Sequence, residues 1–252
     1  MSRVVGIIPA RFASTRFEGK PLAPILGKPM ILYVAELSAK ALGRDNVYVA
    51  TEHPKIAQVV TEAGFQVVMT SPQALTGTDR IFEANQQIGA DVVINIQGDE
   101  PMLNPDDVAL IASEMKTYPG QILCGMSRLL NDEDPHSVNI PKVVCNESGQ
   151  LLYMSRLAVP GFKEEKNKPN FWMKQVCIYG FLKSHLEKFG TFGRKSTLEH
   201  SEDIEILRFF ELNIPIQMIE VSGSSRAVDV PTDIALVESD LQNFSAFKGV
   251  LS

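Results

Sequence analysis

The sequence predicts an α/β fold: a Rossmann-like, doubly wound and mostly parallel sheet with a small lobe of mixed strands. Through the first half, short apolar runs alternate with helix-like segments at the spacing of right-handed βαβ units. From about residue 121, strand-like segments follow one another with fewer helices between them. We therefore expect a single domain over residues 1–252, with the smaller lobe drawn from about 121–195.

The elements of the first half follow from apolar patterning and from proline and glycine. Residues 4–8 form a continuous apolar run, typical of a central strand buried on both faces. Pro29 opens a helix that reaches about residue 42, because a first turn does not need the N–H that proline lacks. Gly64 ends a helix that precedes it. The predicted series is strand 47–51, helix 54–63, strand 66–70, helix 78–88, strand 91–96 and helix 105–117.

The second half is richer in strands. We predict strands over 121–128, 142–145, 151–154 and 176–181, and helices over 198–212 and 232–241. The polar, charged segment 162–170 is expected to form a loop. A parallel core with a more antiparallel appendage accounts for this pattern.

Charge and composition restrict the function. Lys and Arg number 24 against 30 Asp and Glu, a net charge of −6, so the surface as a whole does not suit nucleic acid. The apolar runs are far shorter than the ~20 residues of a membrane span, and the start lacks the pattern of a signal peptide. The three cysteines have no CxxC spacing and are expected to be reduced, buried thiols. These features predict a cytoplasmic enzyme that binds no nucleic acid and does not insert into a membrane.

A basic loop follows the first strand. It carries Arg11, Arg16 and Lys20 together with Ser14, Thr15 and Gly19. Ligands of open α/β sheets bind at the carboxyl ends of strands, so local positive charge here favours a polyanion such as a triphosphate. The loop is not a Walker P-loop, because proline follows Lys20. A solvated basic loop without a ligand is the alternative.

Two acidic motifs suit a divalent cation. Asp99 follows the strand 91–96, and Asp229 precedes the last helix. Mg²⁺ takes one or two protein carboxylates and fills its other positions with phosphate and water. A helix cap is the alternative for Asp229. Gly77 lies between two threonines at a helix start and offers backbone N–H groups to an anion or a base edge, although Thr78 is also a good helix cap.

Other chemistries find no support in the sequence. The four histidines have no metal-ligand spacing, which argues against zinc, and no GxSxG motif is present for acyl-enzyme chemistry.

These motifs, in this order, resemble the 3-deoxy-manno-octulosonate cytidylyltransferase family, whose members couple a sugar acid to CMP. Gln97-Gly98-Asp99-Glu100-Pro101 is one of its most specific stretches. The matching residues span almost the whole chain: 7–11, 19–22, 27–30, 48–51, 76–80, 97–101, 154–156, 178–180, 198–199 and 228–232. The resemblance implies a nucleotide-diphospho-sugar transferase type of fold, a homodimer and a role in lipopolysaccharide biosynthesis.

The resemblance also implies residue roles. The catalytic residues would be Arg11, Lys20 and Asp99, with Asp99 and Asp229 as ligands of Mg²⁺. The nucleotide, CTP, would be bound by Pro9, Ala10, Arg11, Lys20, Thr70, Thr76, Gly77, Thr78 and Arg80. The sugar acid would be bound by Arg16, Gln97, Arg156, Tyr179 and Glu205. The C2 hydroxyl of the sugar would attack the α-phosphorus in line, and pyrophosphate would leave.

Departures from the family pattern lie mostly at the sugar end. Gln175 stands where members commonly carry histidine, and Ile206 follows Glu205 where they carry glutamine. Glu18 replaces a proline in the basic loop. A buried polar substrate group left unpaired costs ~1–3 kcal/mol, enough to alter specificity. The acceptor is therefore expected to be Kdo or a close variant, with 8-amino-Kdo as the leading variant. Gln175 would face its tail, and Glu202 or Glu205 would receive its amine.

Three alternatives remain open. The first is a nucleotidyltransferase of the same fold with another acceptor, such as a polyol phosphate or a nonulosonic acid. The second is a non-catalytic regulator that binds nucleotide sugars, against which the two metal carboxylates argue. The third, a structural protein, would leave the basic loop without a role.

Overall fold

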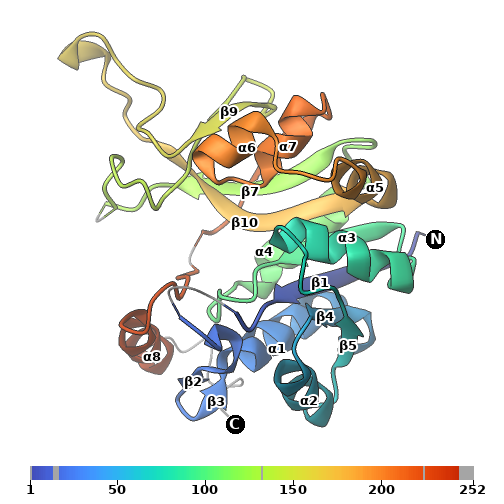
Figure 1. Ribbon diagram of the computed structural model, residues 1–252. Helices are drawn as coiled ribbons and strands as arrows, with labels where there is room; N and C mark the ends of the chain where they lie inside the picture. Colours follow the sequence, from blue (N-terminus) through green and yellow to red (C-terminus); the bar gives the residue numbers. More distant parts are fainter. Residues whose placement is uncertain (1, 14–16, 132, 224, 244–252) are drawn as a thin grey trace.

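The computed structural model describes residues 2–13, 17–131, 133–223 and 225–243. The described residues contain a nine-stranded sheet with the main order β11-β7-β10-β6-β1-β4-β5 (Figure 1). Its first-half strands are β1 (Val4–Ala10), β4 (Val47–Thr51), β5 (Gln66–Met69) and β6 (Val92–Ile96). These four pair in parallel, as the βαβ spacing predicts.

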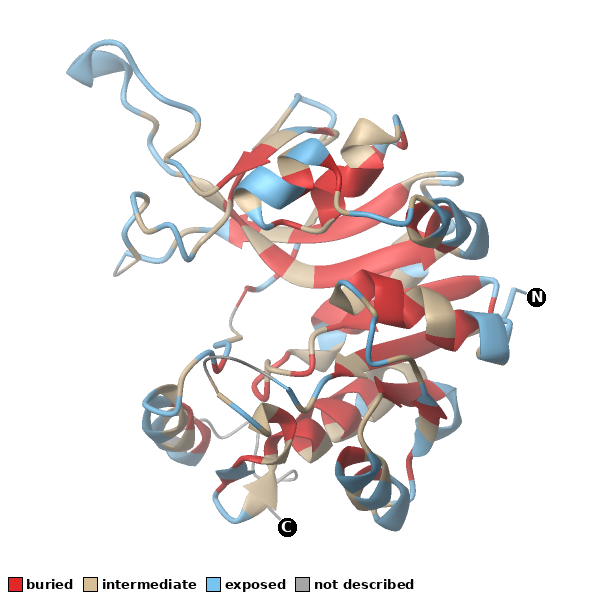
Figure 2. Ribbon diagram, in the orientation of Figure 1, coloured by how far each residue is buried: buried red, intermediate tan, exposed pale blue. Residues whose placement is uncertain are grey.

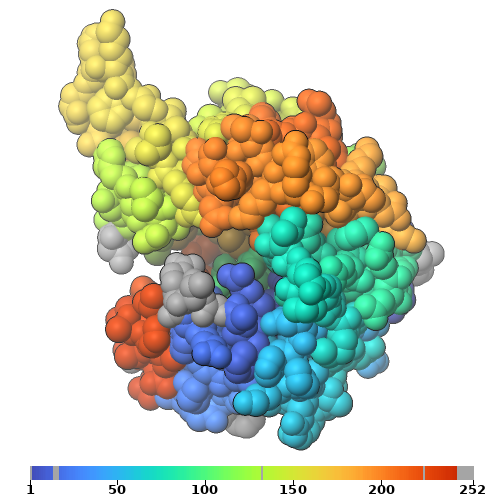
Figure 3. Space-filling model, viewed as in Figure 1, coloured from blue at the N-terminus to red at the C-terminus, as the bar shows by residue number. Residues whose placement is uncertain are grey.

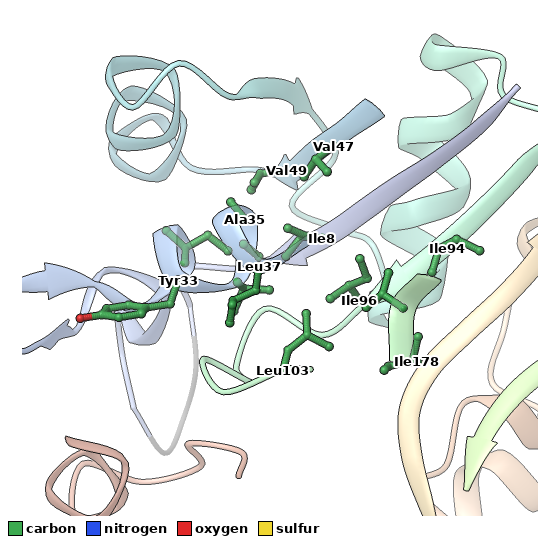
Figure 4. Packing of buried hydrophobic residues seen from close by; sticks show 14 of the residues in the cluster. Ile8, Tyr33, Ala35, Leu37, Val47, Val49, Ile94, Ile96, Leu103 and Ile178 are labelled. Atoms are coloured by element: carbon green, nitrogen blue, oxygen red, sulfur yellow. The ribbon is translucent and has the colours of Figure 1, made fainter. Parts of the chain in front are cut away.

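Helices cover both faces of the central strands. One face packs on α1 (Met30–Leu42), α2 (Pro54–Glu62), α4 (Pro105–Glu114) and α8 (Asp233–Asn243). The other packs on α3 (Gly77–Ile88), α5 (Lys183–Thr191) and α7 (Ile206–Glu211). Neighbours along β1 alternate between the two clusters, with Ile8 in the first and Ile7 in the second. Figure 4 shows Ile8 beside Val49 and Ile96 in the first cluster, and Figure 2 shows the strands buried between exposed helix surfaces.

The second half adds strands to the same sheet. β7 (Ile122–Arg128) pairs in parallel with β11 (Ile216–Glu220), and β10 (Met173–Leu182) runs antiparallel between β7 and β6. Off this path, β8 (Lys142–Cys145) pairs with β10 and with β9 (Leu151–Ser155). The fold is therefore the predicted mostly parallel α/β sheet with mixed strands.

β10 extends past the end of β6. Ile178 is opposite Ile96, the last residue of β6, and the chain direction is antiparallel. The segment before it, which contains Gln175, therefore lies beyond the carboxyl end of β6 and pairs with β7. A register shift between Val176 and Tyr179 separates the two halves of the strand.

Several elements differ from the sequence prediction. The predicted helix 198–212 is two helices, α6 (Thr197–Glu202) and α7, because Asp203 between them is left-handed with φ 50°. Aspartate tolerates this conformation better than most residues. The prediction missed α5 and β11. The segment 162–170 is irregular apart from a short 3-10 turn at Glu165–Asn167, as expected.

The basic loop also contains short elements. A 3-10 turn spans Lys20–Leu22, and β2 (Pro24–Ile25) pairs with β3 (Lys28–Pro29). A further 3-10 turn, Arg44–Asn46, precedes β4. The three cysteines are free thiols. Within the described ranges, no helix combines the length and apolar character that a membrane span requires.

Candidate active site

A cavity of about 280 Å³ opens at the carboxyl ends of β1 and β6. Figure 3 shows a hollow between the orange α6–α7 segment and the blue N-terminal segment. Its lining includes eleven residues singled out from the sequence: Pro9, Ala10, Arg11, Lys20, Thr76, Gly77, Arg80, Gln97, Asp99, Glu205 and Asp229. It also includes residues to which the sequence pattern assigned no role in binding or catalysis: Pro21, Ala74, Leu75, Gly98, Lys195, Glu199 and Asp203.

Lys20 stands between the two acidic motifs. Its ammonium donates to Asp99 Oδ2 at 2.6 Å and to the Val228 carbonyl at 3.0 Å, and it lies 3.9 Å from Asp229 Oδ1. The backbone N–H of Val228 in turn donates to the Asp99 carbonyl at 2.9 Å. The fold thus brings two loops 130 residues apart in sequence to one cation.

Gly98 allows the β6 loop to lie directly against β1. A Cβ atom at this position would be 2.8 Å from the Pro9 carbonyl oxygen, closer than such contacts allow. A side chain here would separate the loop that carries Asp99 from the strand that carries Ala10 and Arg11. The glycine of the Gln-Gly-Asp motif is therefore required by close backbone approach.

The first turn of α3 is held by a carboxylate from α7's start. Glu205 accepts hydrogen bonds from the backbone N–H of Gly77 (3.0 Å), the N–H of Thr78 (2.8 Å) and the Thr78 hydroxyl (2.6 Å). Burial raises the pKa of Glu205, although these hydrogen bonds act to lower it. The N–H groups at this helix start, which the sequence pattern predicts as donors to an anion, thus donate to the carboxylate of Glu205.

A buried arginine also holds the first turn of α3, through ion pairs with two carboxylates. Arg208, which is 0% exposed, contacts Asp79 at 2.8 Å and Glu199 at 2.7 Å. The Thr76 hydroxyl donates to Asp79 Oδ2 at 2.7 Å, so the N-cap of α3 belongs to this network. Helices α3, α6 and α7 are thereby tied together at the cavity wall.

Arg80 lines the cavity but has protein partners. It donates to Thr70 Oγ1 at 2.5 Å and lies 3.0 Å from Glu52 Oε2. Burial lowers the pKa of Arg80, an effect that Glu52 opposes. Thr70 and Thr78, both predicted nucleotide contacts, lie outside the lining of this cavity and instead bond to Arg80 and Glu205.

Most residues predicted for the sugar lie outside the lining. Arg156 donates to the carbonyls of Val138 (2.8 Å), Asp203 (2.9 Å) and Glu202. Gln175 Nε2, in the part of β10 that extends past β6, donates to the Tyr179 hydroxyl at 2.9 Å.

Glu202 is likewise engaged within the protein. It accepts from Ser155 (2.8 Å), from Tyr153 (3.3 Å) and from the N–H of Arg156 (2.9 Å), and these hydrogen bonds lower its pKa against the effect of burial. Arg16 lies outside the described residues. Sequence patterns identified these positions but carried no signal for their internal partners.

Asp99 and Asp229 have the donor chemistry for a hard divalent cation. Both are carboxylates near the ammonium of Lys20, so the fold already accommodates positive charge between them. Oxygen ligands in this number fit Mg²⁺, which relies on phosphate and water for its remaining positions. Among the described residues, no group of three or more His, Cys, Asp or Glu side chains is arranged to hold a metal ion.

Sequence comparisons give a consistent picture. The chain is 36% identical over 255 residues to 3-deoxy-manno-octulosonate cytidylyltransferase of Geobacter metallireducens, covering 96% of this chain and 99% of that protein. It is 37% identical to the Arabidopsis thaliana enzyme named as mitochondrial, covering 94% and 83%. It is 38% identical to 8-amino-3,8-dideoxy-manno-octulosonate cytidylyltransferase of Shewanella halifaxensis, covering 93% and 97%.

Structural comparisons agree. A solved structure of CMP:2-keto-3-deoxy-manno-octonic acid synthetase complexed with CTP superposes with a TM-score of 0.88 at 33% identity, covering 96% of this chain and 99% of that chain. The inositol-1-phosphate CTP transferase from T. maritima, at 15% identity and a TM-score of 0.68, shares the fold. The family model described as cytidylyltransferase matches residues 5–243. The chain therefore belongs to the cytidylyltransferase family.

Proposed function

We propose that this enzyme transfers a cytidylyl group from CTP to a 3-deoxy-octulosonic sugar acid, giving CMP-sugar and pyrophosphate for lipopolysaccharide biosynthesis. The observation that carries the proposal is the arrangement of Lys20, Asp99 and Asp229 on one cavity, in a chain whose relatives bear this activity in their names. A regulator that only binds nucleotide sugars would not need two acidic loops held on one cation.

The residues that line the cavity would have different roles in binding CTP and in the transfer. Arg11 and Lys20 offset negative charge on the triphosphate and on the departing pyrophosphate. Pro9 and Ala10 at the end of β1, with Thr76 and Gly77 at the start of α3, line the part of the cavity that would receive the cytosine and ribose. The sugar hydroxyl attacks the α-phosphorus in line, a transfer that requires positioning and charge neutralisation more than covalent catalysis.

Asp99 and Asp229 are the residues that would hold Mg²⁺. When bound, the ion would neutralise phosphate charge and orient the phosphate chain. Lys20, whose ammonium donates to Asp99 and to the Val228 carbonyl, would offer charge to the phosphate oxygens from the same position.

For the acceptor, we propose Kdo or a close variant, with 8-amino-Kdo as the leading variant. Gln175 lies in the part of β10 that extends past the end of β6, the strand that precedes Asp99. Its side-chain amide donates to the Tyr179 hydroxyl, at the position where family members carry a titratable imidazole. Glu202 and Glu205 already accept hydrogen bonds from Ser155 and Thr78, so either carboxylate can bind the amine of the sugar only by giving up such a donor. Ile206 is 1% exposed in the core, so it acts on specificity through packing.

We further propose that the enzyme is a homodimer and acts in the cytoplasm. Large apolar side chains are exposed on two neighbouring segments, 129–141 and 156–172: Leu130, Val138, Leu157, Phe162 and Phe171. The second segment projects from the body in Figure 1. These exposed apolar side chains are the candidate contacts of the interface. Light scattering of Leu157→Ser with Phe171→Ser, against Leu236→Ser on α8, tests this interface, and an unchanged mass would contradict it.

The decisive experiment is Mg²⁺-dependent release of pyrophosphate from CTP. The acceptors are Kdo, 8-amino-Kdo, a nonulosonic acid, a polyol phosphate and buffer alone. Release with an octulosonic acid supports the proposed reaction, and the ratio of kcat/KM values for the two octulosonates identifies the sugar. Release only with another acceptor, or CTP binding without any turnover, would overturn it.

A further inference from the structure

Lys195 places a cation on the cavity wall opposite the basic loop. It lies just before α6, whereas Asp203 lies just after it, and both line the cavity. The two side chains form an ion pair with Lys195 Nζ 2.8 Å from Asp203 Oδ1. The hydrogen bond from Lys195 lowers the pKa of Asp203 against the effect of burial, and the charges of Lys195, Arg156 and Arg11 act in the same direction. Arg11 lines the same cavity.

The cations around this cavity differ in how firmly the protein holds them. The side chain of Arg80 is 5% exposed and paired with Glu52, and Arg156 is satisfied by three carbonyls. The side chains of Lys195 and Asp203 are 34% and 74% exposed. Ion pairs at such exposure contribute little and exchange readily for a stronger anion. Lys195 is therefore available to a ligand in a way that Arg80 and Arg156 are not.

The pair is nevertheless fixed in place by the backbone. Asp203 adopts a left-handed conformation, and the Arg156 guanidinium binds its carbonyl at 2.9 Å and also the carbonyl of Glu202. Lys142, which is fully buried, donates to the Arg156 carbonyl at 2.6 Å and so helps to hold the Arg156 backbone in place. Asp203 thus holds the ammonium of Lys195 at one point on the cavity wall.

We propose that Lys195 leaves Asp203 to bind an anionic group of the substrates, either the triphosphate of CTP or the carboxylate of the sugar acid. Its positive charge would attract the anion from the α6 side of the cavity, and the charges of Arg11 and Lys20 would attract it from the side of the sheet. Arg156, the residue that the sequence offered for the sugar carboxylate, would serve as a positioning residue that fixes Asp203. The inference rests on the proposed function and extends its binding site.

The test compares Lys195→Met with Lys188→Met, a control on the exposed side of α5. Binding of CTP alone is titrated at several salt concentrations, and KM for the sugar acid is measured at saturating CTP. Loss of one charge-assisted hydrogen bond weakens the affected substrate by about 10-fold or more. A weaker and less salt-dependent CTP affinity identifies the triphosphate as the anion, whereas a raised sugar KM alone identifies the carboxylate. Lys195→Arg should retain most of the affinity.

Asp203→Asn provides the second measurement. Asparagine tolerates the left-handed backbone and removes the charge that holds Lys195, so binding of the same substrate should tighten by a few-fold. That gain should shrink when Lys195→Met is also present, because the ion pair is already lost. If wild type binds CTP and both substrates are unaffected by Lys195→Met, the inference is wrong while the proposed function stands. Failure of wild type to bind CTP would overturn both.

Discussion

The ammonium of Lys20 lies 2.6 Å from the carboxylate of Asp99. The ammonium balances the charge of a carboxylate that we propose as a metal ligand. A short contact of this kind also keeps both groups at the cavity rather than free in solvent. The relationship makes Asp99 the residue on which the proposed chemistry depends most directly.

Asp99→Asn should reduce turnover by at least about 100-fold, since a bound metal contributes several kcal/mol of charge stabilisation. The amide keeps a similar shape, so the folded state should persist in circular dichroism. Asp106→Asn, at an exposed first-turn position of α4, should leave turnover unchanged. Pyrophosphate release measures both variants, and full activity of Asp99→Asn would refute the metal assignment.

Gly98→Ala should impair catalysis by displacing the Asp99 loop from β1. The added Cβ would lie 2.8 Å from the Pro9 carbonyl oxygen, and backbone atoms cannot yield as a side chain would. We expect a loss of stability of ~1–3 kcal/mol, typical of overpacking, together with a lower kcat. Gly161→Ala, with no atom within 4 Å of its added Cβ, is the matched control for both measurements. Equal behaviour of the two variants would contradict the close-approach argument.

Arg208→Met should destabilise the protein strongly. The substitution leaves the carboxylates of Asp79 and Glu199 in the buried network without their cation, a change that costs about 3–5 kcal/mol. Arg226→Met removes an ion pair with Asp240 whose side chains are 50% and 35% exposed, and should cost no more than about 1 kcal/mol. Urea unfolding distinguishes these effects, and similar midpoints would show that the buried triad is not a principal support of α3.

The central strands and the position of the cavity were predictable because local signals and topology agree there. The apolar run of β1 and the loop residues Arg11 and Asp99 all follow from the rule that ligands bind at the carboxyl ends of strands. Tertiary context decided the rest. Gly190 lies within α5, where its added Cβ would be 2.0 Å from Phe82, so packing on α3 rather than propensity selects that residue.

Residue roles at the cavity were harder to predict than its location. Motif matching selected Glu205 and Arg156 as substrate contacts, but the partners that they bind within the protein come from distant segments. Glu205 bonds to Gly77 and Thr78, more than 120 residues away in sequence. Lys195 belongs to no motif. Its place at the cavity is visible only in the structure, where it pairs with Asp203 at the other end of α6.

Stability should fall as the pH is lowered below about 6.5, with His185 as one identifiable cause. This side chain is 4% exposed, and its Nδ1 accepts a hydrogen bond from the Leu182 N–H at 3.2 Å. Burial lowers the pKa of His185, and the charge of Lys188 acts in the same direction, against a hydrogen bond to the Gly120 carbonyl. The unfolded chain therefore binds a proton at a higher pH than the folded chain, so acidification favours unfolding.

The contribution of one such group is at most about 1.4 kcal/mol per pH unit. It is fully present above the unfolded pKa and is lost as the pH falls through the folded pKa. His185→Gln should lower stability at pH 8 yet flatten its decline between pH 7 and 5. His136→Gln, at an exposed position, should leave that slope unchanged. Urea unfolding at stepped pH measures the slopes. An equally steep decline in His185→Gln would exclude this histidine as the cause, because glutamine cannot take up the proton.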